Sequence, residues 1–373
     1  MTHVEAQRPL LHRLLQDAPA AARAARLSYA TEPGPGYRRR RAGKGFVYDD
    51  AHGKRLVDPE ELARCRALAI PPAWQEVWIS ASPRSHIQAT GQDAKGRKQY
   101  KYHPRFRAVR DAAKYAHVLR FGEHLPSLRR RLRRDLGRVR LDRDKVLSAL
   151  VELMQRTCVR VGNDCYALSN GSYGLTTLRD RHATIRGAEL RFKFKGKGGK
   201  LHEVSLEDAR LARIVRRCRE VPGQRLFQFV DGDGKPHAVT SGDVNEYLRR
   251  VTGEPFSAKD FRTWTGTLLA VHSLGTSTPP DNVRAARHEV KQALERVSAE
   301  LGNTVAVCRK SYVHPSVIDL YIRGELAASI ARARRAARQR PLRGLREPEA
   351  VTLHWLRALP ASIEVSPRPR RAR

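Results

Sequence analysis

The pattern of hydrophobic and polar positions changes about a third of the way along the chain. After residue 35, short runs of β-branched and aromatic residues alternate with turns, which predicts strands. These runs are residues 45–48, 77–80, 86–90 and 98–102. Residues 59–68 predict a short helix that ends before Pro71 and Pro72. This part of the chain is therefore expected to form a small, mainly β domain.

The rest of the chain has helical periodicity, with apolar residues three or four positions apart. The expected helices are residues 106–119, 125–136, 145–157, 206–219, 241–252, 266–274, 281–300 and 327–340, with another after Pro315. A hairpin with a glycine- and lysine-rich turn at residues 195–200 interrupts them. Gly302 can end the helix over residues 281–300, and Ser257 can cap the start of a helix. The fold class is thus α+β, with a small β-rich domain and a larger, mainly α domain.

These patterns divide the chain into four segments. Residues 1–34 are an N-terminal extension with one or two short amphipathic helices. The change of periodicity separates a β-rich domain, residues 35–112, from a mainly α domain, residues 113–335. Residues 336–373 are rich in arginine and proline, which predicts a basic C-terminal tail made of a basic helix and a partly disordered end.

The charge balance indicates a polyanionic partner. The 373 residues contain 72 Lys and Arg against 38 Asp and Glu, a formal net charge of +34. Such an excess destabilises a compact chain unless a polyanion neutralises it, and it accelerates encounter with nucleic acid. An anionic membrane surface is the alternative, but the sequence has no bilayer-spanning apolar run and no signal-peptide pattern. We therefore expect a cytoplasmic, nucleoid-associated protein that binds nucleic acid.

The cysteines predict neither a metal site nor a disulfide framework. Their number is odd and no two form a CxxC pair; they are Cys65, Cys158, Cys165, Cys218 and Cys308. We expect them to be reduced and mostly buried.

The last predicted strand carries candidate DNA contacts, because basic and aromatic side chains alternate along it. Alternate residues of a strand share a face. One face would carry Lys98, Tyr100 and Tyr102, and the other Arg97, Gln99 and Lys101. Glutamine can read adenine, and lysine can contact guanine or phosphate, in a DNA groove. The alternative is a solvated edge strand protected by lysines.

Four further residues have side chains suited to phosphoryl transfer. Arg160 and Arg262 lie among apolar residues, where a guanidinium needs an anionic partner. Lys197 lies in the hairpin turn, and Tyr312 follows a basic segment. A phenol with a pKa of about 10 is a poor nucleophile unless cations stabilise its anion. Locally, a salt bridge between Arg160 and Asp164 or another acid, a solvated lysine and a core tyrosine are the ordinary structural interpretations.

Six segments taken in order resemble the type IB DNA topoisomerases, in the poxvirus-like group found in bacteria. The resemblance covers residues 35–330. Its segments are AIPPAW at 69–74, GRKQY at 96–100, RVGN at 160–163, GKGGK at 196–200, KDFRTW at 259–264 and CRKSYVHP at 308–315. Each segment is weak by itself, but six in this order are strongly specific.

The resemblance implies a mechanism and an architecture. Tyr312 would attack one backbone phosphate, expel the 5′-hydroxyl and remain as a 3′-phosphotyrosine. Arg160 and Arg262 would clamp the non-bridging oxygens, and Lys197 would protonate the leaving oxygen. The broken strand would rotate before it is rejoined, without ATP, metal or another cofactor. The two domains would form a C-shaped clamp, in a monomer closing around double-stranded DNA.

One position departs from the viral and eukaryotic pattern. Those enzymes carry a histidine nine residues before the tyrosine, where this chain has Asn303. Asparagine can donate a hydrogen bond to a non-bridging oxygen, but it cannot become cationic. Asn303 is therefore expected to be catalytic without the pH dependence of a histidine.

Two other functions stay open from the sequence. A tyrosine recombinase shares the Arg, Lys, Arg, Tyr chemistry, but usually carries a histidine three residues before the second arginine, where this chain has Lys259. A non-catalytic basic DNA-binding protein would fit the composition alone.

Overall fold

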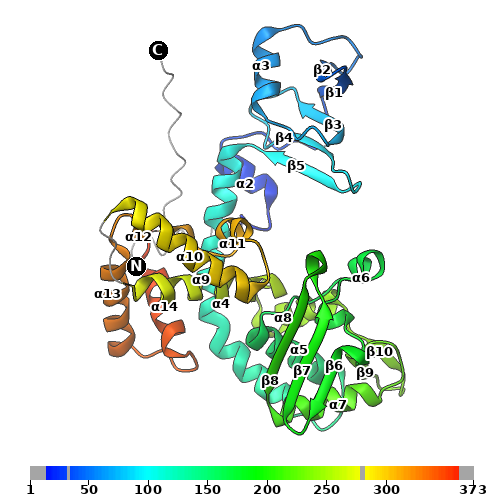
Figure 1. The fold of residues 1–373 in the computed structure, drawn as a ribbon, viewed down its shortest axis with the longest axis vertical. Coiled ribbons are helices and arrows are strands. Elements are labelled where there is room, and N and C mark those ends of the chain that lie inside the picture. The colour runs from blue at the N-terminus through cyan, green and yellow to red at the C-terminus, as the bar shows by residue number, and fades with distance from the viewer. Residues whose placement is uncertain (1–13, 32–33, 278–281, 361–373) are drawn as a thin grey trace. The chain divides into compact units, whose positions relative to one another are not determined.

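The computed structural model describes residues 14–31, 34–277 and 282–360. The chain divides into two compact units, residues 1–117 with 360–373 (unit 1) and residues 118–359 (unit 2). The division falls within one long helix, α4 (Pro104–Leu136), which also contains the boundary predicted at residue 112. A small β-sheet unit followed by a mainly helical unit confirms the predicted α+β class (Figure 1).

Unit 1 contains a five-stranded antiparallel sheet with the order β2-β1-β3-β4-β5. Its strands are β1 (Gly36–Ala42), β2 (Gly45–Asp49), β3 (Gln75–Ser80), β4 (Ile87–Gln92) and β5 (Lys98–Tyr102). The helix α3 (Pro59–Ala67) is capped by Asp58 and contributes Cys65 to a buried cluster with Ile79 and Ala89 of the sheet. Because β5 is at the edge, one side of its backbone has no partner strand in this sheet.

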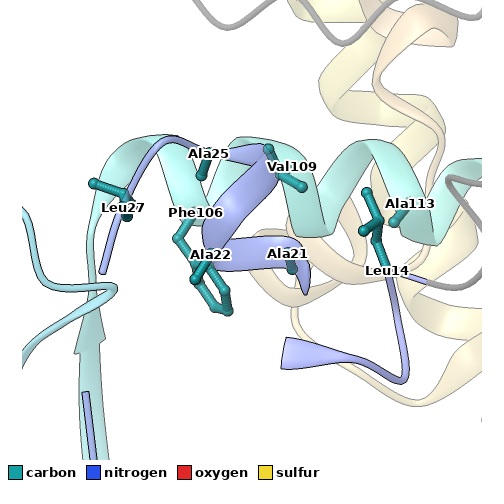
Figure 2. Close-up of a cluster of buried hydrophobic side chains, with 8 residues drawn as sticks. All are labelled: Leu14, Ala21, Ala22, Ala25, Leu27, Phe106, Val109 and Ala113. Atoms are coloured by element: carbon teal, nitrogen blue, oxygen red, sulfur yellow. The ribbon is translucent and has the colours of Figure 1, made fainter. Parts of the chain in front are cut away.

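The N-terminal extension packs on the first turns of α4 through α2 (Ala18–Ala24), as Figure 2 shows. The buried side chains of this cluster are Leu14, Ala21, Ala22, Ala25, Leu27, Phe106, Val109 and Ala113. Arg110 on α4 donates hydrogen bonds to the carbonyls of Leu14, at 2.8 Å, and Leu15, at 2.5 Å. A short helix in the extension is thus confirmed, while residues 1–13 of the extension lie outside the described residues.

The helix α4 is continuous where the sequence predicts two helices, over residues 106–119 and 125–136. The intervening residues do not break it, because Phe121 is buried and lies edge-on to Phe256 and Phe261, with ring centroids 5.2 and 4.9 Å apart. Pro126 inside the helix removes one backbone hydrogen bond. Burial of the Phe121 side chain favours a helix that continues through Pro126. The local sequence pattern does not reveal this burial.

Unit 2 is built mainly of helices. They are α5 (Arg143–Thr157), α6 (Asp164–Asn170), α7 (Ala209–Glu220), α8 (Ser241–Thr252), α9 (Ala258–Gly275), α10 (Val283–Leu301), α11 (Val305–Ser311), α12 (Pro315–Ile322), α13 (Leu326–Gln339) and α14 (Glu347–Ala358). The predicted N-cap at Ser257 is confirmed, because its backbone N–H donates to Asp260 at 2.8 Å, and α9 therefore begins before the predicted residue 266. None of the described helices is both long enough and apolar enough to cross a membrane.

Two small antiparallel sheets complete unit 2. The predicted hairpin is confirmed as β7 (Glu189–Lys195) and β8 (Leu201–Glu207), with β6 (Ala183–Arg186) beside β7. The predicted helix over residues 206–219 begins later, at α7, because β8 continues to Glu207. The other sheet is the antiparallel pair β9 (Gln228–Val230) and β10 (Pro236–Ala238).

The segment after residue 335 differs from the expected basic tail, because α14 is a packed helix. Trp355 is buried and lies edge-on to His314, with ring centroids 5.7 Å apart. Glu349 is only 1% exposed and pairs with Arg129 at 2.7 Å and Arg346 at 2.9 Å. Burial alone would raise the pKa of Glu349, but these hydrogen bonds lower it to about 2. The prediction of a tail rests on amino-acid composition, which does not show that the apolar residues of α14 lie on one side of a helix. The Pro/Arg-rich end lies outside the described residues.

All five cysteines are free thiols, as expected, and only Cys165 among them is exposed.

Candidate active site

Arg160 lies in the segment that leaves α5. Cys158 ends α5 in the left-handed conformation, with φ of 54°. The N–H of Leu175 donates to the carbonyl of Arg160 at 2.9 Å. Gly174 approaches so closely that a Cβ there would lie 2.6 Å from the same carbonyl oxygen. These contacts hold the backbone of Arg160 in place independently of its side chain.

Arg262 lies near the start of α9 and is only 6% exposed. Its guanidinium donates hydrogen bonds to the carbonyl of Cys158, after α5, and to the carbonyl of Leu301, at the end of α10. Carbonyls at helix C-termini carry partial negative charge, so they stabilise the guanidinium without neutralising it. Its Nε is buried and has no hydrogen-bond partner among the described residues. A buried cation with a spare donor is suited to binding an anion.

Asn303 brings the end of α10 to the Arg160 side chain. Gly302 ends α10 with φ of 57°, as predicted. The Arg160 guanidinium donates to the Gly302 carbonyl at 3.1 Å and to Oδ1 of Asn303 at 2.5 Å. The Nδ2 of Asn303 is buried and unpartnered within the described part of the chain. A salt bridge from Arg160 to Asp164 is the wrong interpretation, because Asp164 pairs with Arg225 at 2.7 Å.

Tyr312 follows α11, and its backbone is held against α9. Thr267 donates its hydroxyl to the Tyr312 carbonyl at 3.3 Å and accepts from the His314 N–H at 3.2 Å. Gly266 permits this approach, since a Cβ there would lie 2.7 Å from the Tyr312 carbonyl oxygen. The guanidinium carbon of Arg262 lies 5.3 Å from the centroid of the Tyr312 ring, which is a cation–π distance. The half-buried phenol therefore lies beside a cation.

The electrostatics of these side chains favour an anionic ligand. Burial, and next the charge of Arg262, lower the pKa of Arg160 to about 10, so the Arg160 guanidinium remains charged at neutral pH. Two cations held together in a partly dry site repel each other until an anion lies between them. Each unpartnered buried donor costs about 1–3 kcal/mol. The non-bridging oxygens of a phosphate could accept from Nε of Arg262 and Nδ2 of Asn303.

Lys197 differs from the other predicted catalytic residues. Four of the five lie together: Arg160, Arg262, Asn303 and Tyr312. Lys197 is exposed in a 3-10 turn at the tip of the hairpin between β7 and β8. Two following glycines, Gly198 and Gly199, have φ of 76° and 75°, which gives this tip more backbone freedom than other residues would.

His202 is a residue of this site that the sequence analysis missed. It lies on β8 and stacks on Phe194 of β7, with ring centroids 5.4 Å apart and an interplanar angle of 9°. A Cβ at Gly302 would lie 2.7 Å from its Cε1, and a Cβ at Gly196 would also collide with its ring. Burial, and then Arg160 and Arg262, lower the pKa of His202. A neutral imidazole thus packs between the base of the Lys197 turn and the end of α10; no spacing in the sequence indicated this pairing.

The candidate DNA contacts on β5 alternate as the sequence predicts. Lys98, Tyr100 and Tyr102 are exposed on one face, and the two residues between them are half-buried. The rings of Tyr100 and Tyr102 stack with centroids 5.8 Å apart. On the other side, Arg97 and Gln99 both contact Asp93, at 2.6 and 3.0 Å. The side-chain hydrogen bond from Arg97 is the main cause that lowers the pKa of Asp93 to about 2.

Comparison with known families finds two matches along the chain. Residues 103–336 match the catalytic core of eukaryotic DNA topoisomerase I. Residues 45–93 match the N-terminal domain of bacterial DNA topoisomerase IB. The first match spans more than half of the chain and contains all five predicted catalytic residues.

Curated relatives agree with these matches. The chain is 31% identical over 293 residues to DNA topoisomerase 1B of Acanthamoeba polyphaga mimivirus, covering 77% of this chain and 87% of the relative. It is 21% identical over 253 residues to DNA topoisomerase I of monkeypox virus and to DNA topoisomerase 1B of vaccinia virus. These two alignments cover 66% of this chain and 76% of each relative.

Proposed function

We propose that this chain, which belongs to the type IB DNA topoisomerases, relaxes supercoiled DNA with Tyr312 as its nucleophile. As a member of this family it is an isomerase that breaks and rejoins DNA strands. The assignment of residues rests on one arrangement: Arg262 lies beside the Tyr312 ring, and Arg160, which interacts electrostatically with both, is hydrogen bonded to Asn303. Two buried donors, on Arg262 and Asn303, are left for a ligand.

The proposed cleavage step is a transfer of one phosphoryl group. The Tyr312 oxygen attacks phosphorus and loses its proton to water, and the bond from phosphorus to the 5′-oxygen breaks. Lys197, carried in by its hairpin, gives a proton to the leaving 5′-oxygen. The product is a 3′-phosphotyrosine and a free 5′-hydroxyl. Rejoining is the reverse reaction, after the cut strand has rotated.

Three side chains stabilise the charge that develops on the non-bridging oxygens. The guanidiniums of Arg160 and Arg262 supply positive charge and hydrogen bonds, and Nδ2 of Asn303 supplies a neutral donor. Their geometry is set before DNA binds, because Arg160 and Arg262 each donate to backbone carbonyls at the end of α10. Preorganised donors of this kind contribute about 3–4 kcal/mol each to transition-state stabilisation.

The phosphotyrosine keeps the energy of the broken bond, so the proposed cycle needs neither ATP nor a metal ion. Lys98, Tyr100 and Tyr102, with Arg97 and Gln99 beside them, contact the major groove. A cytoplasmic monomer closes its two domains around the duplex as a C-shaped clamp.

Plasmid relaxation tests the proposal. The wild-type chain should relax a supercoiled plasmid that lacks any recombination site, in EDTA and without ATP. Tyr312→Phe should abolish relaxation and the covalent adduct while keeping duplex binding. Tyr321→Phe is the matched control, because Tyr321 hydrogen bonds to Glu289 and Ser277 and has no proposed chemical role.

The outcomes separate the candidate functions. Mass spectrometry of the trapped adduct should place the nucleotide on Tyr312. Relaxation by Tyr312→Phe at the wild-type rate would refute the assignment. Absence of relaxation by the wild-type chain, with binding intact, would favour a recombinase or a non-catalytic DNA-binding protein.

A further inference from the structure

The segment that follows α2 is fixed along the residues just before β4. The N–H of Ser28 donates to the Arg84 carbonyl at 2.9 Å, and the N–H of His86 donates to the Ser28 carbonyl at 2.9 Å. The N–H of Ala30 donates to Nδ1 of His86 at 3.1 Å. Two backbone bonds and one bond to a buried ring hold Tyr29 between them. The position of Tyr29 is therefore determined by the fold of unit 1.

Tyr29 belongs to a row of aromatic rings that continues onto β5. Its ring stacks on His86, with centroids 4.3 Å apart and an interplanar angle of 17°. His86 lies 6.3 Å from Tyr102, which stacks in turn on Tyr100 at 5.8 Å. We call Tyr29, His86, Tyr102 and Tyr100 the aromatic row. Phe106, part of the cluster in Figure 2, lies under it, 4.9 Å from His86 and 5.4 Å from Tyr102.

The tyrosines of the aromatic row are exposed although the ring between them is buried. Tyr29 is 46% exposed, Tyr102 37% and Tyr100 44%, whereas His86 is buried. Burial lowers the pKa of His86, so its imidazole is neutral and acts as an apolar spacer. Ring stacking covers one ring face in each stacked pair, and the exposed remainder of each tyrosine is available to a partner. Exposed tyrosines held in a fixed row are typical of a binding surface.

We propose that Tyr29 extends the DNA-contacting surface of β5, so that the N-terminal extension contributes directly to binding of duplex DNA. This inference rests on the proposed role of β5. The inference adds Tyr29 to the DNA-contacting residues. Tyr29 lies before the segment that matches the bacterial N-terminal domain, which begins at residue 45.

The charges around Tyr29 fit a phosphate backbone. Residues 18–31 contain two arginines, Arg23 and Arg26, and no carboxylate. Both are exposed, as is Arg84 next to the backbone bond with Ser28. A tyrosine hydroxyl donates to a phosphate oxygen, and arginines contact neighbouring phosphates. Contacts with phosphates do not depend on the base sequence. Substitution of Tyr29 is therefore expected to change the affinity for DNA without changing the cleavage-site preference.

Equilibrium binding to a fluorescent 30-base-pair duplex tests this inference. Every protein is the full chain carrying Tyr312→Phe, which prevents cleavage. Tyr29→Phe keeps the ring on His86 and removes only the hydroxyl, and it should weaken binding between about two- and tenfold. Arg26→Ala should reduce the slope of log K against log salt by about one. Val57→Ala, at a site 75% exposed in the same unit, is the surface control and should bind as the parent does.

Variants of β5 make the two proposals separable. Lys98→Ala and Tyr100→Phe should weaken binding if β5 contacts DNA. If they do while Tyr29→Phe and Arg26→Ala bind like the parent, the inference about the extension is wrong and the role of β5 stands. If the β5 variants bind like the parent, the role of β5 is refuted and the inference fails with it. A melting temperature equal to that of the parent excludes unfolding as the cause of weaker binding.

Discussion

Replacing Gly302 with alanine adds one methyl group at the centre of the site. Gly302 ends α10 with φ of 57°, and its carbonyl accepts from Arg160. The new Cβ would lie 2.7 Å from Cε1 of His202, closer than such atoms approach in proteins. His202 cannot move away freely, because it stacks on Phe194 and packs against Gly196. The turn that carries Asn303 must therefore shift.

The cost has two parts that can be separated. Alanine in the left-handed conformation costs about 1–2 kcal/mol relative to glycine. Overpacking against the imidazole adds about 1–3 kcal/mol. Gly324→Ala measures the backbone part alone, because Gly324 follows Arg323, the C-cap of α12, with φ of 74°, and a Cβ there would meet nothing within 4 Å. Gly302→Ala should therefore lower the free energy of unfolding by about 2–5 kcal/mol, the sum of the two parts, and Gly324→Ala by about 1–2 kcal/mol.

The catalytic effect should follow the shift of Asn303 and Arg160. A displacement of about 1 Å can slow a preorganised reaction about a hundredfold. We expect single-turnover cleavage by Gly302→Ala to be about 10–100 times slower, with Gly324→Ala at the wild-type rate. Urea unfolding measures the stabilities, and quenched-flow formation of the covalent adduct measures the rates.

A double-mutant cycle with His202→Ala decides whether the imidazole is responsible. Adding Gly302→Ala to His202→Ala should cost only the backbone part, about 1–2 kcal/mol. Equal losses of stability in Gly302→Ala and Gly324→Ala, with wild-type cleavage by both, would refute the reasoning. So would a Gly302→Ala cost that is unchanged by removal of the imidazole.

Three further predictions concern individual charged and polar groups. Arg160→Ala should slow single-turnover cleavage about 10²–10³-fold while duplex affinity changes less, since it removes a donor to the transition state; an equal loss in both would contradict this role. Asn303→His should give cleavage a titration near the histidine pKa of about 6.5 that the wild type lacks, and identical pH–rate profiles would count against Asn303 as a phosphate donor. Glu349→Gln should destabilise unit 2 at pH 7 by up to about 3 kcal/mol, because the pKa of Glu349 falls from its ordinary 4.5 to about 2 on folding. This stability is present above pH 4.5 and is lost as pH falls toward 2, so thermal melts of the two proteins should converge there; a gap independent of pH would argue against the ion pair.

Local signals in the sequence predicted most elements of this site. Gly302 was expected to end α10, and its positive φ is a conformation that glycine adopts without cost. The alternation on β5 follows from the period of a strand, and exposure along Lys98–Tyr102 has that period. The six ordered segments predicted the family, which the matches over residues 45–93 and 103–336 confirm.

Predictions failed where a distant partner decides the outcome. Asp164 is the acid nearest to Arg160 in sequence, but it pairs with Arg225 instead. α4 continues through Pro126 because Phe121 packs on Phe256 and Phe261, more than a hundred residues away. α14 is helical and packed because Glu349 meets Arg129 and Trp355 meets His314.

By itself, the sequence determined which side chains are available for the chemistry, the elements that carry them and the family to which the chain belongs. Those properties depend on backbone preferences and on short periodicities, which operate between residues close together in the chain. Only the tertiary structure decided that Arg160 meets Asn303, that Arg262 lies beside the ring of Tyr312, and that His202 packs against Gly302. The residues of these pairs are separated by 50 to 143 positions in the chain. They meet because α5, α9 and α10 pack together and because the hairpin of β7 and β8 places His202 against the end of α10.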